Sequence, residues 1–201
     1  MNFSFIKNWE LAAKTKQATI EYREHAQYFH HHEAYTLQYR HGDRDIHISL
    51  YLQNEPDRGR GYLEHFTRVY VPFDNSLPLS LKVCRSSWLR QLSVIFRRSH
   101  HRRTALAFDK KFHLTGHPKE VLQRFFSDPD IIQPLLHFND LYIEIIPGHQ
   151  FDQFLVSSKQ DVLVIQLNKI LTTEEDITRL IDYTEYWSSL LPSVSKHDPA
   201  R

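Results

Sequence analysis

Histidine is the residue type with the most obvious capacity for chemistry here, because it makes up 14 of the 201 residues. Four histidines, His25 and His30 to His32, lie in the stretch "HAQYFHHHE", and His47 follows further along the chain. His30 and His32 would share one face of a strand, and a neighbouring strand could bring His47 or His25 close enough to complete a site for Zn, Ni or Cu. The same imidazoles titrate near neutral pH, so the cluster could instead sense pH. Because the other histidines are dispersed, we predict exposed or locally bonded histidines, no cofactor, and His30, His32 and His47 only as metal candidates.

A strongly basic segment is the second candidate for chemistry. Residues 82–111 contain nine Lys and Arg residues and a single acid, so they carry a net +8 in a chain of net +1. Cations beside apolar side chains are typical of helices that lie on anionic membranes, and arginines also bind nucleic-acid phosphates. Exposed arginines form a solvated rim or face an acidic protein partner equally well. The residues of this candidate binding surface are Trp88, Arg90, Arg97, Arg98, Arg102 and Arg103.

Motifs of known catalytic and nucleotide-binding sites are absent. The chain has no Walker A loop, no dinucleotide-binding glycine motif and no G-x-S-x-G elbow. Cys84 is the only cysteine, which excludes an intramolecular disulfide and a thiolate zinc cluster and fits a reducing cytoplasm. Its position in an alternating strand predicts burial, not a reactive thiol. An enzyme would need an arrangement such as Asp109, His113 and His117 meeting in a cleft, so we expect no catalytic activity.

The elements that must position these residues follow from the hydrophobic pattern. Alternating apolar residues predict strands in two groups, and apolar residues at helical spacing predict helices between and after them. Thr173 with Asp176 predicts the start of the last helix, because a threonine hydroxyl there can accept a backbone N–H. The predicted helices are 6–17, 88–97, 116–126, 127–138 and 172–191, and the predicted strands are 35–39 and 46–50 around Gly42, 64–73, 79–85, 141–147, 153–158 and 161–168.

This order predicts an α+β fold, with mainly antiparallel sheet or sheets, helices inserted in the middle and a closing C-terminal helix. We expect residues 1–191 to form one globular domain, or two lobes of about 1–105 and 106–191, and residues 192–201 to form a flexible tail. The N-terminus does not have the pattern of a signal peptide, and no apolar run approaches the roughly 18 residues of a membrane span. We therefore expect a soluble, cytoplasmic protein.

Residues 66–136 resemble a loosely defined bacterial family of uncharacterised proteins. The resemblance lies in a strand of the form T-x-x-x-V-P, followed by F-D-x-x-F-x-V-x-G and a nearby proline. It implies a bacterial α+β domain and assigns no catalytic or binding residue. The matching residues are Thr67, Val71, Pro72, Phe108, Asp109, Phe112, Gly116 and Pro118, with Leu114 where the family has valine.

The sequence thus predicts a soluble bacterial protein without catalytic activity that acts through contacts with a protein partner. An acidic face on that partner would complement the basic segment. The alternative is peripheral binding of an anionic membrane through residues 85–103, which we rank ahead of nucleic acid because the chain has no nucleic-acid recognition motif. An enzyme ranks third, and the oligomeric state is not predicted.

Overall fold

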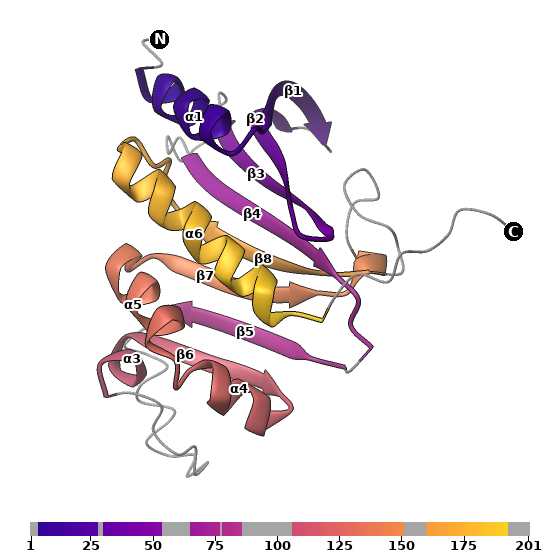
Figure 1. Cartoon of the computed structure of the whole chain (residues 1–201), viewed down its shortest axis with the longest axis vertical. Coiled ribbons are helices and arrows are strands. Elements are labelled where there is room, and N and C mark those ends of the chain that lie inside the picture. Colours follow the sequence, from indigo (N-terminus) through magenta and orange to yellow (C-terminus); the bar gives the residue numbers. More distant parts are fainter. Residues whose placement is uncertain are drawn as a thin grey trace, which may run out of the picture.

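Eight strands form one antiparallel sheet in this computed structural model, which describes residues 4–27, 30–53, 65–76, 78–85, 106–150 and 160–192. The strand order is β1-β2-β3-β4-β8-β7-β5-β6 (Figure 1), so the two C-terminal strands, β8 and β7, are inserted between β4 and β5. The predicted α+β class and the antiparallel pairing are confirmed. The strands are β1 (Thr19–Gln27), β2 (His30–His41), β3 (Arg44–Gln53), β4 (His65–Phe73), β5 (Ser80–Arg85), β6 (Phe112–His117), β7 (Leu141–Ile146) and β8 (Asp161–Leu167).

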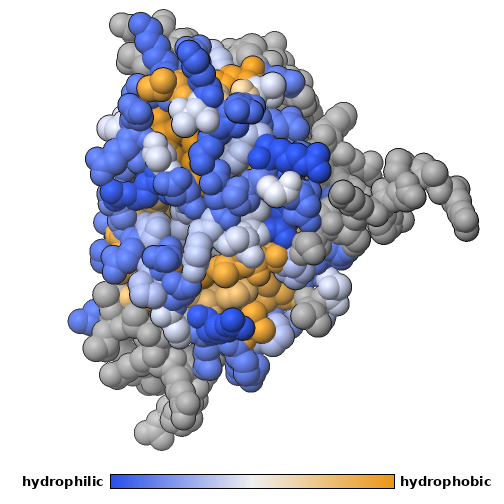
Figure 2. All heavy atoms as spheres, viewed as in Figure 1, coloured by the Kyte–Doolittle hydropathy of each residue, from blue (hydrophilic) through white to orange (hydrophobic). Residues whose placement is uncertain are grey.

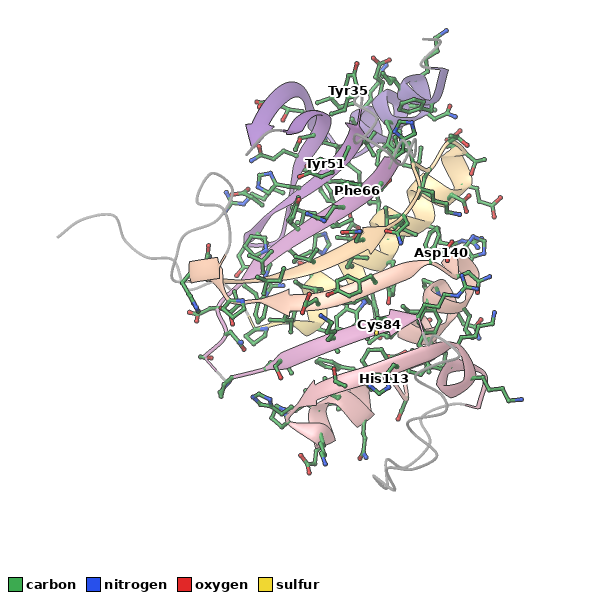
Figure 3. The ribbon with its side chains drawn as sticks, turned by 180° about the vertical axis from the view of Figure 1, so that it is seen from behind. Tyr35, Tyr51, Phe66, Cys84, His113 and Asp140 are labelled. Carbon is green, nitrogen blue, oxygen red and sulfur yellow. The ribbon has the colours of Figure 1, made fainter. Side chains whose placement is uncertain are left out.

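The described α-helices all lie on one side of the sheet. Figure 1 shows them in front of the strands, and the view from behind shows the strands in front of the helices (Figure 3). The molecule therefore has two layers, and no described helix covers the second face of the sheet. No helix among the described residues is long and apolar enough to cross a bilayer. The helices are α1 (Ser4–Thr15), α3 (Leu106–Lys111), α4 (Lys119–Phe125), α5 (Pro129–Phe138) and α6 (Glu174–Leu190), with a short 3-10 helix η1 (Gly148–Gln150).

The core lies between the layers and follows the two-residue period of the strands. In β7, Leu141, Ile143 and Ile145 are buried towards the helices, whereas Tyr142 and Glu144 alternate with them and are half-buried. The other strands contribute alternate residues in the same way. Burying one such aliphatic side chain stabilises the fold by about 1.5–3 kcal/mol.

Helix α6 is the central element of the helix layer. Its N-cap is Thr173, whose hydroxyl accepts the backbone N–H of Asp176 at 3.2 Å, as the sequence predicts. The face predicted from spacing is buried, and Trp187 near its C-terminal end is fully buried. The ring of Trp187 packs edge-on against Phe125 at 5.6 Å, which joins α6 to α4. Helix α1 is attached through Trp9, whose indole N–H donates to the carbonyl of Leu171 just before α6 at 2.9 Å.

Two strands were missed in the sequence prediction. Strand β1 has so many charged and polar residues that its alternation is not visible, and the middle of the chain, predicted as helical, contains the edge strand β6. Gly116 in β6 has φ +144°, and an added Cβ atom would lie 2.1 Å from the carbonyl oxygen of Ser80. The predicted helix 88–97 and strand 153–158 lie outside the described residues.

The C-terminal end of α6 is held by a buried arginine from the hairpin between β2 and β3. Arg44 is only 4% exposed, and its guanidinium donates to the Ser188 hydroxyl at 3.1 Å and to the Leu191 carbonyl at 2.8 Å. It also donates to the carbonyl of Pro192. Burial lowers the pKa of Arg44, and the neighbouring carboxylate of Asp43 opposes this. The last carbonyls of a helix lack hydrogen-bond donors within the helix, and the helix dipole favours a positive charge at this end. The guanidinium of Arg44 supplies both the donors and the charge.

We predict that Arg44→Met destabilises the protein by about 2–4 kcal/mol, because buried carbonyls then lose charged hydrogen-bond donors. Urea unfolding followed by circular dichroism measures the loss. The matched control is Arg40→Met, an exposed arginine in the same hairpin, which should change the free energy of unfolding by less than about 0.5 kcal/mol. Equal effects of the two substitutions would contradict the proposed role of Arg44.

Candidate functional site

The sheet face that points away from the helices carries aromatic and charged side chains on its central strands. We call this surface the open face. Figure 3 looks onto it and shows Tyr51 and Phe66 side by side on the neighbouring strands β3 and β4. These two residues stand at alternate positions to the core residues Leu50 and Val69, so they point away from the helix layer. The other residues discussed on this face are Arg68, Tyr70, Lys82, Tyr142, Glu144, Ile146, Val164 and Gln166.

Arg68 lies at the centre of an aromatic cluster on the open face. The rings of Tyr51 and Phe66 are stacked, with centroids 4.5 Å apart and an interplanar angle of 18°. The guanidinium carbon of Arg68 lies 4.9 Å from the Phe66 centroid and 5.6 Å from the Tyr51 centroid. Its Nε and Nη2 donate to the side-chain oxygen of Gln166 on β8, at 2.9 and 2.6 Å. This half-buried guanidinium is therefore held in place by two rings and one neutral amide.

A pair of tyrosines lies beneath this cluster. The hydroxyl oxygens of Tyr51 and Tyr70 are 2.6 Å apart, and Tyr70 is only 2% exposed. Burial raises the pKa of Tyr70 far above its ordinary value, the neighbouring Tyr51 adds to this, and the positive charge of Arg68 opposes it. With its pKa raised, the Tyr70 hydroxyl stays protonated and carries no negative charge, so it cannot neutralise Arg68.

A second charged group on the open face is internally neutralised. The ammonium of Lys82 on β5 lies 3.0 Å from a carboxylate oxygen of Glu144 on β7, and the Tyr142 hydroxyl donates to the other oxygen. The Lys82 ammonium also lies 5.4 Å from the Tyr142 ring centroid. Hydrogen bonds to Tyr142 and Glu144 raise the pKa of Lys82, so the ammonium stays charged and remains paired with the carboxylate.

A hollow of about 400 Å³ separates Arg68 from the Lys82–Glu144 pair. Its walls include the Arg68 guanidinium on one side and Tyr142 with Glu144 on the other. Two aliphatic side chains, Ile146 and Val164, form part of its lining. The hollow thus combines one cation, one carboxylate and an apolar surface, which is the composition of a binding site in which a few polar groups fix orientation. Its full lining is Arg68, Tyr142, Glu144, Ile146, Val164, Gln166 and Asn168.

His47, one of the histidines predicted as metal ligands, does not lie close to His32. On β2, His32 pairs with Gln53, whereas His47 on β3 pairs with Gln38. Six residues of strand therefore separate His47 from His32, which is roughly 20 Å. His47 is also buried, at 6% exposed. The register thus separates His47 from His32, whereas the backbone of His25 on β1 pairs directly with that of His32. The side chains of residues 22–34 lie outside the description, so the metal candidates His30 and His32 stay a prediction; within the described part of the chain no cluster of three or more potential metal-ligating residues occurs.

The basic candidate surface lies outside the described residues. This applies to Trp88, Arg90, Arg97, Arg98, Arg102 and Arg103, so its membrane and partner interpretations stay predictions. Arg85, the first residue of the proposed membrane-binding segment 85–103, is described. Its guanidinium lies 2.8 Å from the carboxylate of Asp140, so its charge is neutralised within the chain.

The alternative catalytic arrangement does not form either. His113 and His117 are four residues apart on β6, or about 13 Å, so they do not meet in one cleft. The Ser80 hydroxyl oxygen lies 2.7 Å from Nδ1 of His117 and accepts the backbone N–H of the same residue at 3.1 Å. No carboxylate contacts His117 among the described residues, so the serine lacks the third member of a hydrolytic triad.

Cys84 differs from the prediction of a buried residue. It is half-buried and lies opposite His113 on the open face (Figure 3).

A second hollow lies in the helix layer, between α5 and α6. It measures about 820 Å³, and its described lining carries four carboxylates, from Asp130, Glu174, Glu175 and Asp182, with one arginine. That arginine, Arg179, is paired with Glu175 at 2.8 Å. The surface of the helix side is mostly hydrophilic in Figure 2. This groove therefore repels anions, in contrast to the cationic centre of the open face.

A histidine next to this groove has the partners of a structural residue. Nε2 of His137 lies 2.9 Å from a carboxylate oxygen of Asp176, and its Nδ1 lies 2.7 Å from a guanidinium nitrogen of Arg179. The hydrogen bond from His137 lowers the pKa of Asp176. Both ring nitrogens of His137 are therefore occupied, and the histidine has no free position for proton transfer to a substrate.

Comparison with known proteins finds no matching family model, no matching curated protein and no matching solved structure. The resemblance to a bacterial family therefore stays a prediction. Its residues have packing roles here: Val71, Phe108 and Phe112 are buried in the core, and Gly116 permits the close approach of β5 and β6.

The open-face residues were not among the predicted site residues, although the sequence contains a signal for them. In "HFTRVYVPF", the core positions Val69 and Val71 alternate with Phe66, Arg68 and Tyr70. On the face opposite the core, this strand carries two aromatic residues and an arginine. A face that only contacts solvent usually carries small polar residues instead. The prediction considered only the apolar set of positions in this strand.

We predict that Arg68→Gln lowers the free energy of unfolding by less than about 1 kcal/mol, because half-buried cation–π contacts contribute little to stability. The matched control is Val69→Ala, the next residue on the same strand, which points into the core at 0% exposed. This control should cost about 2 kcal/mol or more. If urea unfolding gave equal losses for both, the Arg68 cluster would be a structural feature and not a binding site.

Proposed function

We propose that this protein is a non-catalytic interaction domain that binds a protein partner on the open face of its sheet. The observation that carries the proposal is the half-buried guanidinium of Arg68, which lies against the stacked rings of Tyr51 and Phe66 and lacks a carboxylate partner among the described residues. An unneutralised charge that the fold holds in one orientation is of use chiefly to a ligand.

The composition of the open face supports a protein partner. Tyrosine, phenylalanine and arginine are enriched at protein interfaces, and tyrosine, tryptophan and arginine dominate their energetic centres. These residue types come together on β3 (Tyr51), β4 (Phe66 and Arg68) and β7 (Tyr142). Gln166 lies on β8, the strand between β4 and β7. The adjacent hollow would accept a side chain of the partner.

The proposal also agrees with the absence of a reactive arrangement within the described part of the chain. The Lys82 and Glu144 charges neutralise each other, and His117 contacts Ser80 without a carboxylate to orient it. Binding requires neither a nucleophile nor a general base, whereas hydrolytic or transfer chemistry requires both in contact.

Site-specific photo-crosslinking tests this proposal. Benzoylphenylalanine in place of Phe66 reports on the open face, and the same residue in place of Thr178, an exposed position of α6, is the matched control on the helix layer. In cells that express the full chain, we expect one discrete protein adduct from position 66 and none of the same mass from position 178. Adducts from position 178 alone would move the interaction to the helix layer and contradict the proposal.

Binding of an anionic membrane through residues 85–103 is the competing proposal, supported by the net charge of that segment. The three tryptophans separate the two proposals, because Trp9 and Trp187 are buried in the core at 2% and 0% exposed. A change of Trp emission on a membrane would therefore come from Trp88. We expect no blue shift with vesicles of phosphatidylserine and phosphatidylcholine. A blue shift that disappears in Trp88→Phe and at high salt would instead support the membrane.

A further inference from the structure

We infer that Arg68 binds the carboxylate of an acidic residue in an extended segment of the partner, with an apolar neighbour of that residue in the adjoining hollow. This inference rests on the proposed function and names the chemistry that the open face would recognise.

The first step is the charge of Arg68. Two described basic residues of β5 have carboxylate partners, Lys82 with Glu144 at 3.0 Å and Arg85 with Asp140 at 2.8 Å. Arg68 instead donates to the amide oxygen of Gln166 and lies close to the neutral hydroxyl of Tyr70. Its positive charge is therefore left for a ligand.

The second step is the geometry of the guanidinium. A guanidinium has five N–H donors, and Gln166 accepts two of them through a single oxygen atom. The stacked rings of Tyr51 and Phe66 fix the guanidinium on the sheet surface. A planar group with several donors in a fixed orientation matches the two oxygens of a carboxylate, and little side-chain entropy is lost when the ligand binds.

The third step is the choice of a protein over a nucleic acid. Among the described residues, Arg68 is the only cation that lines the hollow, and the Glu144 carboxylate also lines it. Binding of nucleic acid depends on several phosphate contacts, and a second phosphate would meet this carboxylate. A single carboxylate beside an apolar side chain would meet no second anion, and the half-buried Ile146 in the lining gives the apolar side chain a contact. An acidic residue followed or preceded by an aliphatic residue therefore fits the hollow.

The experiment is a selection of peptides that bind the full chain. A phage-displayed library of random peptides of about ten residues is selected on the wild-type protein, and enriched peptides are synthesised with a fluorescent label. We expect enriched sequences to share an Asp or Glu next to an aliphatic residue. Fluorescence polarisation should then show that Arg68→Gln weakens the best peptide about ten- to a hundredfold, as expected for the loss of a charged hydrogen-bond pair.

Three comparisons make the selection specific. The matched control Arg40→Gln removes the same charge from an exposed position of β2 and should change the affinity less than about twofold. Arg68→Lys keeps the charge but loses the planar geometry, so it should not restore full affinity. Replacing the acidic residue of the peptide by its amide should weaken binding to the wild type and leave binding to Arg68→Gln almost unchanged.

The outcomes separate this inference from the proposed function. Peptides that lack an acidic residue but lose affinity in Phe66→Ala would overturn the carboxylate inference and leave the open face as the interaction surface. Peptides insensitive to both Phe66→Ala and Arg68→Gln, or no enrichment over an uncoated surface, would overturn both. Arg68-dependent binding of a single-stranded oligonucleotide of about 20 residues, without enrichment of peptides, would replace the protein partner by a nucleic acid.

Discussion

The structure depends on the burial of one face of an antiparallel sheet beneath helix α6. The two central strands, β4 and β8, supply Val69, Val71, Leu163 and Ile165 to this layer, and each of these side chains is fully buried. Trp187 lies over the same core from the helix side. Because alternate residues of a strand point to opposite faces, placing these residues under α6 also decides which residues point away from it.

The open face follows directly from this constraint. Once Val69 is fixed in the core, Arg68 and Tyr70 must lie on the other side of β4, and pairing with β8 brings Gln166 opposite Arg68. The register of β3 then places Phe66 opposite Tyr51. The cluster is thus built from three adjacent strands at the middle of the sheet, where pairing on both sides restricts movement. A site on such strands keeps its geometry without support from loops.

The sequence predicts those features that depend on local pattern. The strands β2, β3, β4, β5 and β7 each show apolar alternation, β8 shows a short continuous apolar run, and α6 shows a capping threonine and an apolar stripe, so their existence follows from the residues alone. Strand β1 and strand β6 lie at the two edges of the sheet, where one side of the strand is unpaired and polar residues are tolerated, so their pattern is weak.

The separation of His47 from the other histidines could not be predicted, because it depends on a different kind of information. His32 and His47 lie in the same hairpin, but only the register shows that His47 pairs six positions away from His32. The register is a property of the pairing and not of either strand.

The hollow on the open face and the groove between α5 and α6 have opposite electrostatic character, and this affects how a partner would be oriented. The groove between α5 and α6 carries four carboxylates with one arginine that is already paired, whereas the hollow on the open face contains the unneutralised Arg68. An acidic segment is therefore attracted to one layer and repelled by the other, so electrostatics favours one face before any close contact forms. The net charge of +1 does not reveal this difference, because it sums over both faces. In the proposed function, recognition depends on where the fold holds a charge in a fixed orientation without a carboxylate partner, and Arg68 is such a charge on the open face.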